Sequence, residues 1–483
     1  MIIARLVFTL ETPLHCGGGK DQFLDLPVLR DSAGFYLIPG SSIAGIIRSE
    51  ALKFDESENN EVSEILFGSN REDNQNASLF WCSDAHLLDF DGQCALSKYI
   101  KGQKVEIAEY KGPYIRDHVK IDEKTLTACP GGKYDEEIVP IGAKFSVEIK
   151  LDGWNKEIPQ NVEDLFIKVM SKLMSESISF GGKQTNGYGK ITFDSDSELR
   201  RFDLFNQNDM MSYVNLSSSP RFISTDRGQK IELPKYKHEA KNENSVSGTI
   251  EIKLSCTGPV MVSGSSDDNS DADFTSMTVP SYIYGKSSSH MQSKPVIPGS
   301  SIKGVLYHRI QTIAKVKGQQ NNCIEKIFGS IVGENAGIGR VRVYDMFYEN
   351  SHKKQLIQHV SIDRFTGGAL KAALFNEEPI WDANSAFTLK IEVNNMPLKE
   401  FGLLSFALLD LVQGDLPIGN GTNRGNGRFS IRKGLASDID CLSCILSYQD
   451  KVVNIKDGKG DLDVAMSILK QIDEEFVDGT DKL

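Results

Sequence analysis

The sequence lacks any apolar run long enough to cross a membrane, and residues 1–4 (MIIA) show none of the architecture of a secretory signal. It also lacks a disulfide framework, because its eight cysteines are scattered along 483 residues. Cys441 and Cys444 have the spacing of half a zinc site, but no second pair completes it. These absences predict a cytoplasmic protein without a membrane partner, and they leave the role of Cys441 and Cys444 open.

Positive net charge is lacking as well, since the formal charge is −12 at pH 7. That balance argues against a general binder of polyanions, although it leaves room for local basic strips within a larger assembly. No Gly-x-x-x-x-Gly-Lys-Ser/Thr sequence occurs, which excludes a nucleoside triphosphatase of the P-loop type.

What the sequence does contain is a hexapeptide, Ile-Pro-Gly-Ser-Ser-Ile, that occurs at residues 38–43 and again at 297–302. Apolar residues recur at helical spacing after both copies, so each copy predicts a helix that begins after a Pro-Gly turn. The free N–H groups of a helix start, together with serine hydroxyls, form a potential phosphate site. A single copy is better explained as a capped helix, but two copies in the same surroundings favour the phosphate site.

The surroundings of the hexapeptide are duplicated too. Four further segments recur in the same order: LFGS at 66–69 and IFGS at 327–330, HVKID at 118–122 and HVSID at 359–363, FSVEI at 145–149 and FTLKI at 387–391, GGKQTNGYGKI at 181–191 and GNGTNRGNGRF at 419–429. A repeat of this length indicates one domain plan that is used twice.

The order of expected elements in the first copy indicates an α+β fold. The pattern predicts, in chain order, a strand over 3–12, a helix after residue 40, a strand over 78–82, a polar excursion to about residue 140, a strand over 145–151, an amphipathic helix over 162–178 and a strand over 190–193. This order suits a ferredoxin-like sheet with two helices on one face. We expect a first domain over 1–204, a polar linker over 205–247, a second domain over 248–433 and a C-terminal extension over 434–483 that ends in an acidic, frayed tail.

Three features together resemble the RAMP superfamily of CRISPR-associated proteins. They are a glycine-rich loop after the first strand, Pro-Gly-Ser-Ser before the first helix, and the Gly187-Tyr188-Gly189-Lys190 type of loop before the last strand. The resemblance covers about residues 1–195 and 248–432 and is strongest to the backbone subunits of type III effector complexes. It implies two tandem ferredoxin-like (RAMP/RRM-like) domains with inserted β-hairpin thumbs. The implied partners are guide RNA (crRNA), complementary target RNA and other CRISPR effector subunits.

The resemblance also implies a cleavage site. In that family an aspartate in the loop before the Pro-Gly-Ser-Ser helix cleaves target RNA, and the matching position here is Asp25. Alignment of the two glycine-rich loops places Asp271 opposite Asp25. The second loop is 13 residues longer, however, and Asp267, Asp268 and Asp273 compete with Asp271 for this role.

Taken alone, a loop aspartate is more often a turn residue or a cap than a catalytic group. If Asp25 helps to hold Mg²⁺ or Mn²⁺, phosphate oxygens of RNA and water would complete the shell. The cation would then stabilise charge at the phosphate while the neighbouring 2′-hydroxyl attacks in line. His15 is a candidate for proton transfer, but its counterpart is Met261, which favours a structural role.

Further residues are predicted to bind RNA because they lie in the glycine-rich loops, in the helices after the hexapeptides or in the first HVxID segment, whose location matches the family's thumb hairpins. The alternatives are a tight hairpin for each glycine-rich loop, a solvated helix charge for Arg48 and a plain strand start for each HVxID segment. The predicted RNA-binding residues are Gly18, Lys20, Ser41, Ser42, Arg48, Lys120, Gly182, Lys183, Tyr188, Lys190, Ser300, Ser301, Lys303, Arg424 and Arg428.

Three functions remain open at this point. The favoured one is a guide-RNA-binding subunit with metal-dependent endoribonuclease activity on target RNA. The second is a structural RNA-binding subunit without a nuclease site. The third is a guide-processing endoribonuclease that acts without a metal.

Overall fold

The computed structural model describes most of the chain from residue 1 to residue 460. Of residues 442–460 only the backbone is described. The segments outside the described residues are 20–21, 58–59, 72–73, 106–112, 123–124, 126, 154–156, 176–177, 237–244, 257, 265–270, 285–289, 317–321, 331–336, 349–354, 382–385, 432–441, 449–450, 457–458 and 461–483. The acidic tail, Lys20, Asp267 and Asp268 therefore lie outside them, and so does residue range 464–472, where the sequence has a short helical pattern. No helix in the described part of the chain is long and apolar enough to span a membrane.

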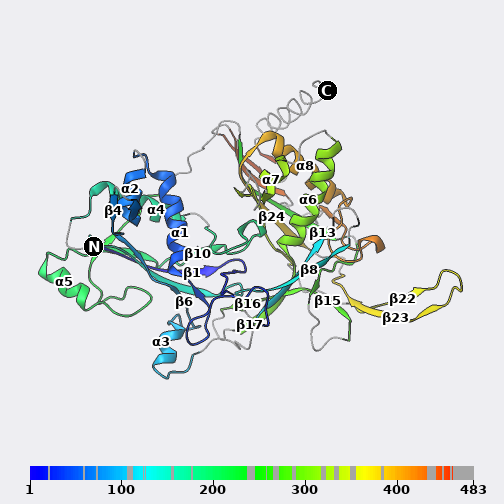
Figure 1. Cartoon of the computed structure of the whole chain (residues 1–483), viewed down its shortest axis with the longest axis horizontal. Coiled ribbons are helices and arrows are strands. Elements are labelled where there is room, and N and C mark those ends of the chain that lie inside the picture. Colours follow the sequence, from blue (N-terminus) through cyan, green and yellow to red (C-terminus); the bar gives the residue numbers. More distant parts are fainter. Residues whose placement is uncertain are drawn as a thin grey trace.

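Two α+β units lie side by side along the longest axis of the molecule (Figure 1). The first unit contains β1 (Ile2–Leu10), β2 (Leu37–Ile38), α1 (Gly40–Phe54), α2 (Glu61–Phe67), β3 (Ser69–Arg71), β4 (Asn74–Asn76), β5 (Phe80–Cys82), β6 (Ala85–Leu87), α3 (Ala95–Ile100), β7 (Ile115–Ile121), β8 (Ala128–Glu137), β9 (Lys144–Leu151), α4 (Gln160–Ser175), the 3-10 turn η2 (Gln184–Asn186), β10 (Ile191–Phe193), β11 (Glu198–Arg201), α5 (Gln207–Val214) and β12 (Gln229–Ile231).

The second unit contains β13 (Ser245–Cys256), β14 (Ser263–Gly264), β15 (Phe274–Ser276), β16 (Thr278–Ile283), β17 (His290–Ile297), α6 (Gly299–Val316), α7 (Asn322–Phe328), β18 (Gly329–Ser330), β19 (Gly337–Ile338), β20 (Val341–Val343), β21 (Met346–Phe347), β22 (Ile357–Ile362), β23 (Ala369–Glu378), β24 (Phe387–Pro397), α8 (Leu398–Gln413), the 3-10 turn η3 (Thr422–Arg424), β25 (Phe429–Ile431), β26 (Leu442–Tyr448), β27 (Lys451–Lys456) and β28 (Lys459–Gly460).

Each unit is built on an antiparallel sheet with the same strand order. In the first sheet the order is β10–β1–β9–β5, and in the second it is β25–β13–β24–β20. Within each unit the chain runs strand, helix, strand, strand, helix, strand through these elements. That succession and strand order fit the ferredoxin-like arrangement expected from the sequence.

Helices cover one face of each sheet and bury an apolar stripe against it. Every second residue of β9 is buried, and α4 turns Leu165, Val169 and Leu173 inward, as its predicted 3.6-residue pattern requires. Helix α1 buries Ile43 and Ile47 in the same core. The second unit repeats this packing with α6 and α8, and its core is a separate cluster. The predicted amphipathic helix and strands are thus confirmed.

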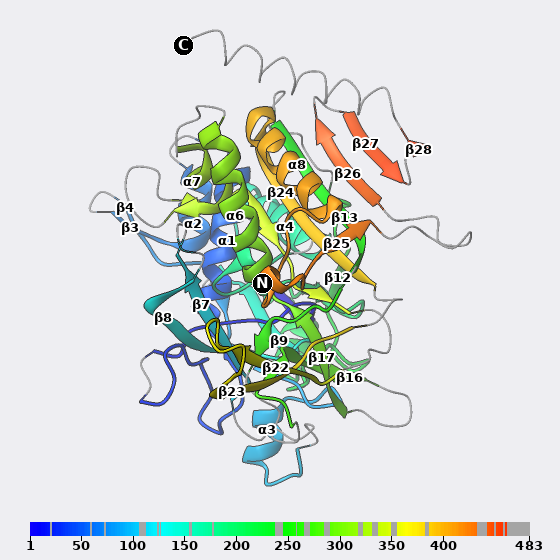
Figure 2. The ribbon, with the colours of Figure 1, turned by 90° about the vertical axis from the view of Figure 1, so that its right-hand side faces the viewer.

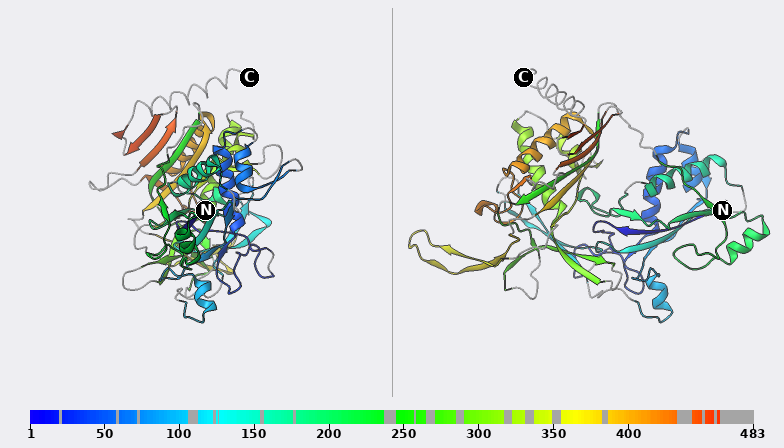
Figure 3. Two further views of the ribbon diagram at one scale, coloured as in Figure 1. Left: turned by 90° about the vertical axis from the view of Figure 1, so that its left-hand side faces the viewer. Right: turned by 180° about the vertical axis from the view of Figure 1, so that it is seen from behind.

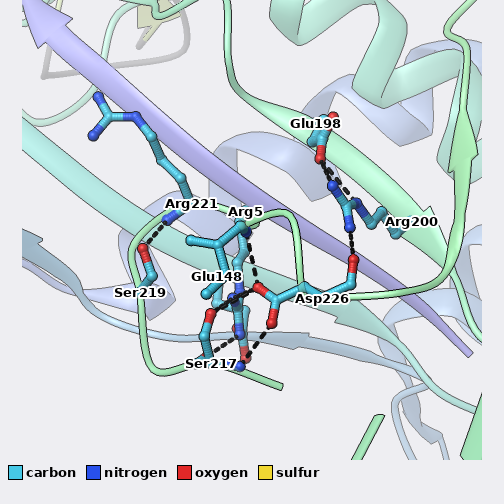
Figure 4. A network of polar contacts seen from close by, with 9 residues as sticks. Arg5, Glu148, Glu198, Arg200, Ser217, Ser219, Arg221 and Asp226 are labelled. Atoms are coloured by element: carbon cyan, nitrogen blue, oxygen red, sulfur yellow. Dashed lines mark hydrogen bonds and ion pairs between the residues drawn. The ribbon is translucent and has the colours of Figure 1, made fainter. Parts of the chain in front are cut away.

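The segment expected to connect the domains also completes the first unit. It forms α5, and its strand β12 pairs with β11 at the edge of the first sheet. Figure 4 shows the loop between them held by Arg5 of β1, which donates to the Asp226 carboxylate at 3.3 Å and to the Ser217 carbonyl at 2.7 Å. Arg5 is only 6% exposed, so these bonds fix the loop against the sheet.

The C-terminal extension likewise adds to the second unit. Strand β26 pairs with β13 in the position that β11 takes beside β1, and β27 and β28 continue the sheet outward (Figure 2). The residues that follow each unit therefore widen its sheet rather than only extending the chain.

The polar excursions between the second and third strands of each unit contain long antiparallel hairpins. The first is β7–β8 and the second is β22–β23, which projects away from the body of the molecule (Figures 1 and 3). The two HVxID segments lie on β7 and β22, the first strand of each hairpin.

The two units meet through a hairpin that is present only in the second. Strands β16 and β17 replace the tight turn at 31–35 of the first unit, and this hairpin accounts for most of the extra loop length. Tyr282 of β16 is 5% exposed and packs into the core of the first unit, and its backbone N–H donates to Ile141 O at 2.7 Å. A buried aromatic side chain from one unit in the core of the other ties the two together.

Candidate nucleic-acid interface

The two helices that follow the hexapeptides begin in the same way. The backbone N–H of Gly40 donates to Asp84 Oδ1, and that of Gly299 donates to Asp345 Oδ1, both at 2.8 Å. A Cβ at either glycine would lie within 2.7 Å of a backbone carbonyl oxygen, so only glycine allows this close approach. The residue that caps α1 is Pro39, so the serines of the first hexapeptide do not cap the helix. Ser41 and Ser42 lie in the first turn of α1 and are exposed.

The second helix start is partly covered by the first unit. The carbonyl oxygen of Asn186, in the glycine-rich loop of the first unit, lies 2.8 Å from where a Cβ of Gly299 would be. Lys303 of α6 donates to Thr185 Oγ1 in the same loop at 2.8 Å, and burial lowers the pKa of Lys303 to about 8. Ser300 and Ser301 are accordingly half-buried. The structure thus brings the glycine-rich loop of one unit to the helix start of the next.

A buried carboxylate, Glu136 of β8, joins the first hairpin to that glycine-rich loop. Its Oε2 lies 2.8 Å from His118 Nε2, 3.0 Å from Lys183 Nζ and 3.3 Å from the Tyr188 hydroxyl. Burial of Glu136 tends to raise its pKa, but the contacts with His118 and Lys183 outweigh this and lower it. The His118 ring also stacks on Tyr134 at 4.9 Å. Lys183 is therefore engaged with the hairpin base.

The second unit repeats this cluster with different residues. Glu377 of β23 lies 3.0 Å from His359 Nε2 and 2.5 Å from a guanidinium nitrogen of Arg424. The His359 ring stacks on Phe375 at 5.0 Å, as His118 stacks on Tyr134. Each unit thus couples its hairpin to its glycine-rich loop through a histidine, a buried glutamate and a cation.

Asp25 lies at the foot of the first hairpin. Its backbone N–H donates to Asp135 Oδ1 at 2.7 Å, and its Oδ2 accepts from the backbone N–H of Asp135 at 3.1 Å. Asp135 immediately precedes Glu136, so the loop aspartate and the hairpin cluster are held in register. Asp25 is exposed, while the candidate proton carrier His15 is buried with Nδ1 2.9 Å from Glu137 O. This placement fits the structural role expected for His15.

The counterpart of Asp25 in the second unit is Asp273, which corrects the alignment with Asp271. Asp273 Oδ2 accepts from the backbone N–H of Asn376 at 2.7 Å, as Asp25 accepts from Asp135. The parallel pairing of β15 with β23 fixes this register, because Phe274 stands opposite Glu377 as Leu26 stands opposite Glu136. The carbonyl oxygen of Asp271 accepts from the Asn376 side chain at 3.3 Å.

The predicted RNA-binding residues divide into accessible and inaccessible ones. Two predictions need correction: Tyr188 is 1% exposed, and Lys190 is 6% exposed with Nζ 3.2 Å from Glu392 Oε1 of the second unit. Both hold the units together, so neither reaches RNA directly. The remaining described candidates on exposed positions are Gly18, Ser41, Ser42, Arg48, Lys120, Gly182, Arg424 and Arg428.

One residue pair at the centre of the site was not predicted. The Arg116 guanidinium of β7 pairs with the Asp345 carboxylate of the second unit at 2.8 Å, and both side chains are at most 2% exposed. Arg116 also donates to the Tyr188 hydroxyl at 3.0 Å. Burial opposes the charge of Arg116, but Asp345 and Tyr188 raise its pKa. The only signal in the sequence is an arginine within a strand next to the HVKID segment.

Polar contacts therefore run without interruption from the start of α6 to the first hairpin. Gly299 N–H and Arg116 share the Asp345 carboxylate, and Tyr188 links Arg116 to Glu136.

Comparison with known proteins agrees with the duplication that this geometry shows. A family model of the RAMP superfamily matches residues 7–192 and 253–430, which together exceed half of the chain.

Two individual relatives share less than a third of their aligned residues with this chain. The CRISPR system Cms endoribonuclease Csm3 of Methanocaldococcus jannaschii is 28% identical over 208 residues, which are 40% of this chain and 78% of that protein. A chain of a type III-B Cmr-beta complex, solved by cryo-EM in the apo state, is 17% identical and aligns over 40% of this chain and 96% of its own length. The TM-score of that alignment is 0.31. The match of the family model to both units shows that the chain belongs to the RAMP superfamily, with two RAMP repeats.

Proposed function

We propose that this protein is a guide-RNA-binding backbone subunit of a type III CRISPR effector and that it cleaves guide-paired target RNA at Asp25. The observation that carries the proposal is the position of Asp25, which is exposed and fixed to the hairpin base by two reciprocal hydrogen bonds with Asp135. Fixed position is what a catalytic carboxylate needs, since displacement by about 1 Å can cost on the order of a hundredfold in rate. The family membership and the endoribonuclease name of the relative support the same class of activity.

The carboxylates at this position fit a hard divalent cation such as Mg²⁺ or Mn²⁺. Among the described residues no group of three or more protein ligands is assembled. Asp25 and Asp135 are adjacent, however, and Mg²⁺ is commonly held by one or two carboxylates with substrate phosphates and water. When bound, the cation would neutralise charge at the scissile phosphate. Asp25 would hold it, and Asp135 would keep the Asp25 backbone and carboxylate in place.

We further propose that β7–β8 and β22–β23 are the thumb hairpins of two tandem ferredoxin-like domains. The two hairpins occupy the same place in both units and are anchored by equivalent clusters around Glu136 and Glu377. The guide would cross both units in one direction, because the two helix starts are related by the repeat. Exposed positions such as Arg48, Arg424 and Arg428 would contact its phosphates.

The test uses the assembled complex loaded with guide RNA and an end-labelled complementary target. We expect defined cuts in the target with Mg²⁺ or Mn²⁺ and none with EDTA, whereas guide binding persists in both conditions. Target cleavage that continues in EDTA would contradict the metal-dependent mechanism. Binding without any cleavage would instead identify a structural RNA-binding subunit.

A further inference from the structure

The contact between the two units shows how one RAMP repeat receives another. On the first unit the contact surface carries Arg116 and Lys190, and we call it the contributing surface. On the second unit it carries Asp345 and Glu392, and we call it the receiving surface. The two sides of the contact are therefore different surfaces. A contact of this head-to-tail kind leaves one surface of each type unused. The first unit still presents its own receiving surface, and the second unit still presents its own contributing surface.

The strand pairings identify the residues on these unused surfaces. On the receiving side, Asp84 corresponds to Asp345 because each accepts from the glycine that begins the helix. Lys150 corresponds to Glu392, since Trp81–Lys150 in the first sheet matches Arg342–Glu392 in the second.

On the contributing side, Ile357 corresponds to Arg116. The match follows from the hairpin registers, in which Arg116 stands opposite Glu136 and Ile357 stands opposite Glu377. Arg428 corresponds to Lys190, because each directly precedes the last strand of its unit.

A second copy of this chain fits the receiving surface poorly. Ile357 would face Asp84, so the carboxylate would gain no cation in place of the Arg116–Asp345 pair. Arg428 would face Lys150, which places two positive charges where the internal contact has a lysine and a glutamate. The first unit also lacks the β16–β17 hairpin that inserts Tyr282 across the internal contact. Charge mismatch of this kind selects against a wrong partner.

The receiving surface nevertheless has the features of a contact surface. Asp84 is exposed, and among the described residues no lysine or arginine forms an ion pair with it. Trp81 is 49% exposed beside Lys150, whose Nζ lies 4.8 Å from the indole ring. Exposed tryptophan is enriched where protein surfaces meet.

We propose that the face formed by Asp84, Lys150 and Trp81 binds a different chain of the same fold and excludes a second copy of this one. The partner presents an arginine or lysine to Asp84 and a neutral or acidic residue to Lys150. This inference deepens the proposed role as one subunit of an assembly. Its test involves neither RNA nor cleavage, so its failure would leave the proposed nuclease activity untouched.

The test is sedimentation velocity of the purified chain at increasing concentration and low salt. We expect the wild-type chain to sediment as a monomer throughout. The double variant Ile357→Arg/Arg428→Glu restores both charge pairs toward Asp84 and Lys150, and it should shift to dimers and longer species as concentration rises. Adding Asp84→Asn to this variant should return it to the monomer, and so should high salt, which screens the pairs.

A second route guards against misfolding of one variant. Ile357→Arg combined with Lys150→Glu pairs the native Arg428 with a new carboxylate and should produce the same association. Circular dichroism checks that both variants fold like the wild-type chain. Wild-type self-association that Asp84→Asn abolishes would overturn the proposal. Folded charge-restored variants that both stay monomeric would overturn the assignment of Asp84 and Lys150 as the selecting residues.

Discussion

The buried pair between Arg116 and Asp345 makes the strongest prediction about stability. Asp345→Asn keeps an oxygen that can accept from Gly299 N–H but removes the charge opposite a guanidinium whose side chain is 1% exposed. Leaving one member of a buried ion pair without its partner costs about 3–5 kcal/mol. The internal control is Asp84→Asn, the same position in the first unit. There the carboxylate is exposed, and only its favourable interaction with the helix start is lost, about 0.3–1 kcal/mol.

Urea unfolding followed by circular dichroism measures this difference. The midpoint of Asp345→Asn should lie well below that of the wild-type chain, whereas Asp84→Asn should lie close to it. Replacing both partners, as in Arg116→Met with Asp345→Asn, should recover part of the loss because neither member of this pair is then left as an unpaired buried charge. Equal urea midpoints for Asp345→Asn and Asp84→Asn would refute the claim that the buried Arg116–Asp345 ion pair stabilises the contact between the units.

Three further predictions concern other contacts of the site. Burial lowers the pKa of Lys303 to about 8, so between that pH and the pKa of about 10.4 of an unfolded lysine the unfolded chain binds more protons and stability should rise with pH; thermal melts should show a smaller rise for Lys303→Met. The pKa of Glu136 is lowered, so its charged form stabilises the fold above about pH 4.3, and this stabilisation is lost as pH falls below that value. Thermal melts should therefore show a smaller loss of stability on acidification for Glu136→Gln than for the wild-type chain. Tyr282→Ala should destabilise the contact between the units by about 3–5 kcal/mol and speed limited proteolysis, whereas Tyr282→Phe should be nearly neutral because the buried hydroxyl has no hydrogen-bond partner among the described residues.

Local features of the fold were readable from the sequence. The stripe of Leu165, Val169 and Leu173 predicted α4, and the repeated hexapeptide predicted the start of α1 and α6. These features depend on residues one or two turns apart, where helical periodicity and turn chemistry dominate. The duplication was visible for the same reason, since each repeated segment is short and contiguous.

The site itself depended on contacts that periodicity does not encode. Lys190 looked like a phosphate ligand beside a glycine-rich loop, but Glu392 neutralises it from 202 residues away. Asp273 takes the place of Asp25 because β15 pairs with β23, and loop spacing alone could not establish that register. Long-range pairing therefore decided which of the predicted residues stay accessible.

The central claim is that a loop aspartate fixed to the hairpin base cleaves target RNA. It is tested by a denaturing gel of end-labelled target RNA with Mg²⁺, comparing complexes that carry Asp25→Asn, Asp273→Asn or Asp271→Asn. We predict that Asp25→Asn removes one defined cut while target binding is retained. If the second unit cleaves, Asp273→Asn should remove a separate cut, and Asp271→Asn should change nothing. An unchanged band pattern for Asp25→Asn would contradict the account and leave the protein as a binding subunit.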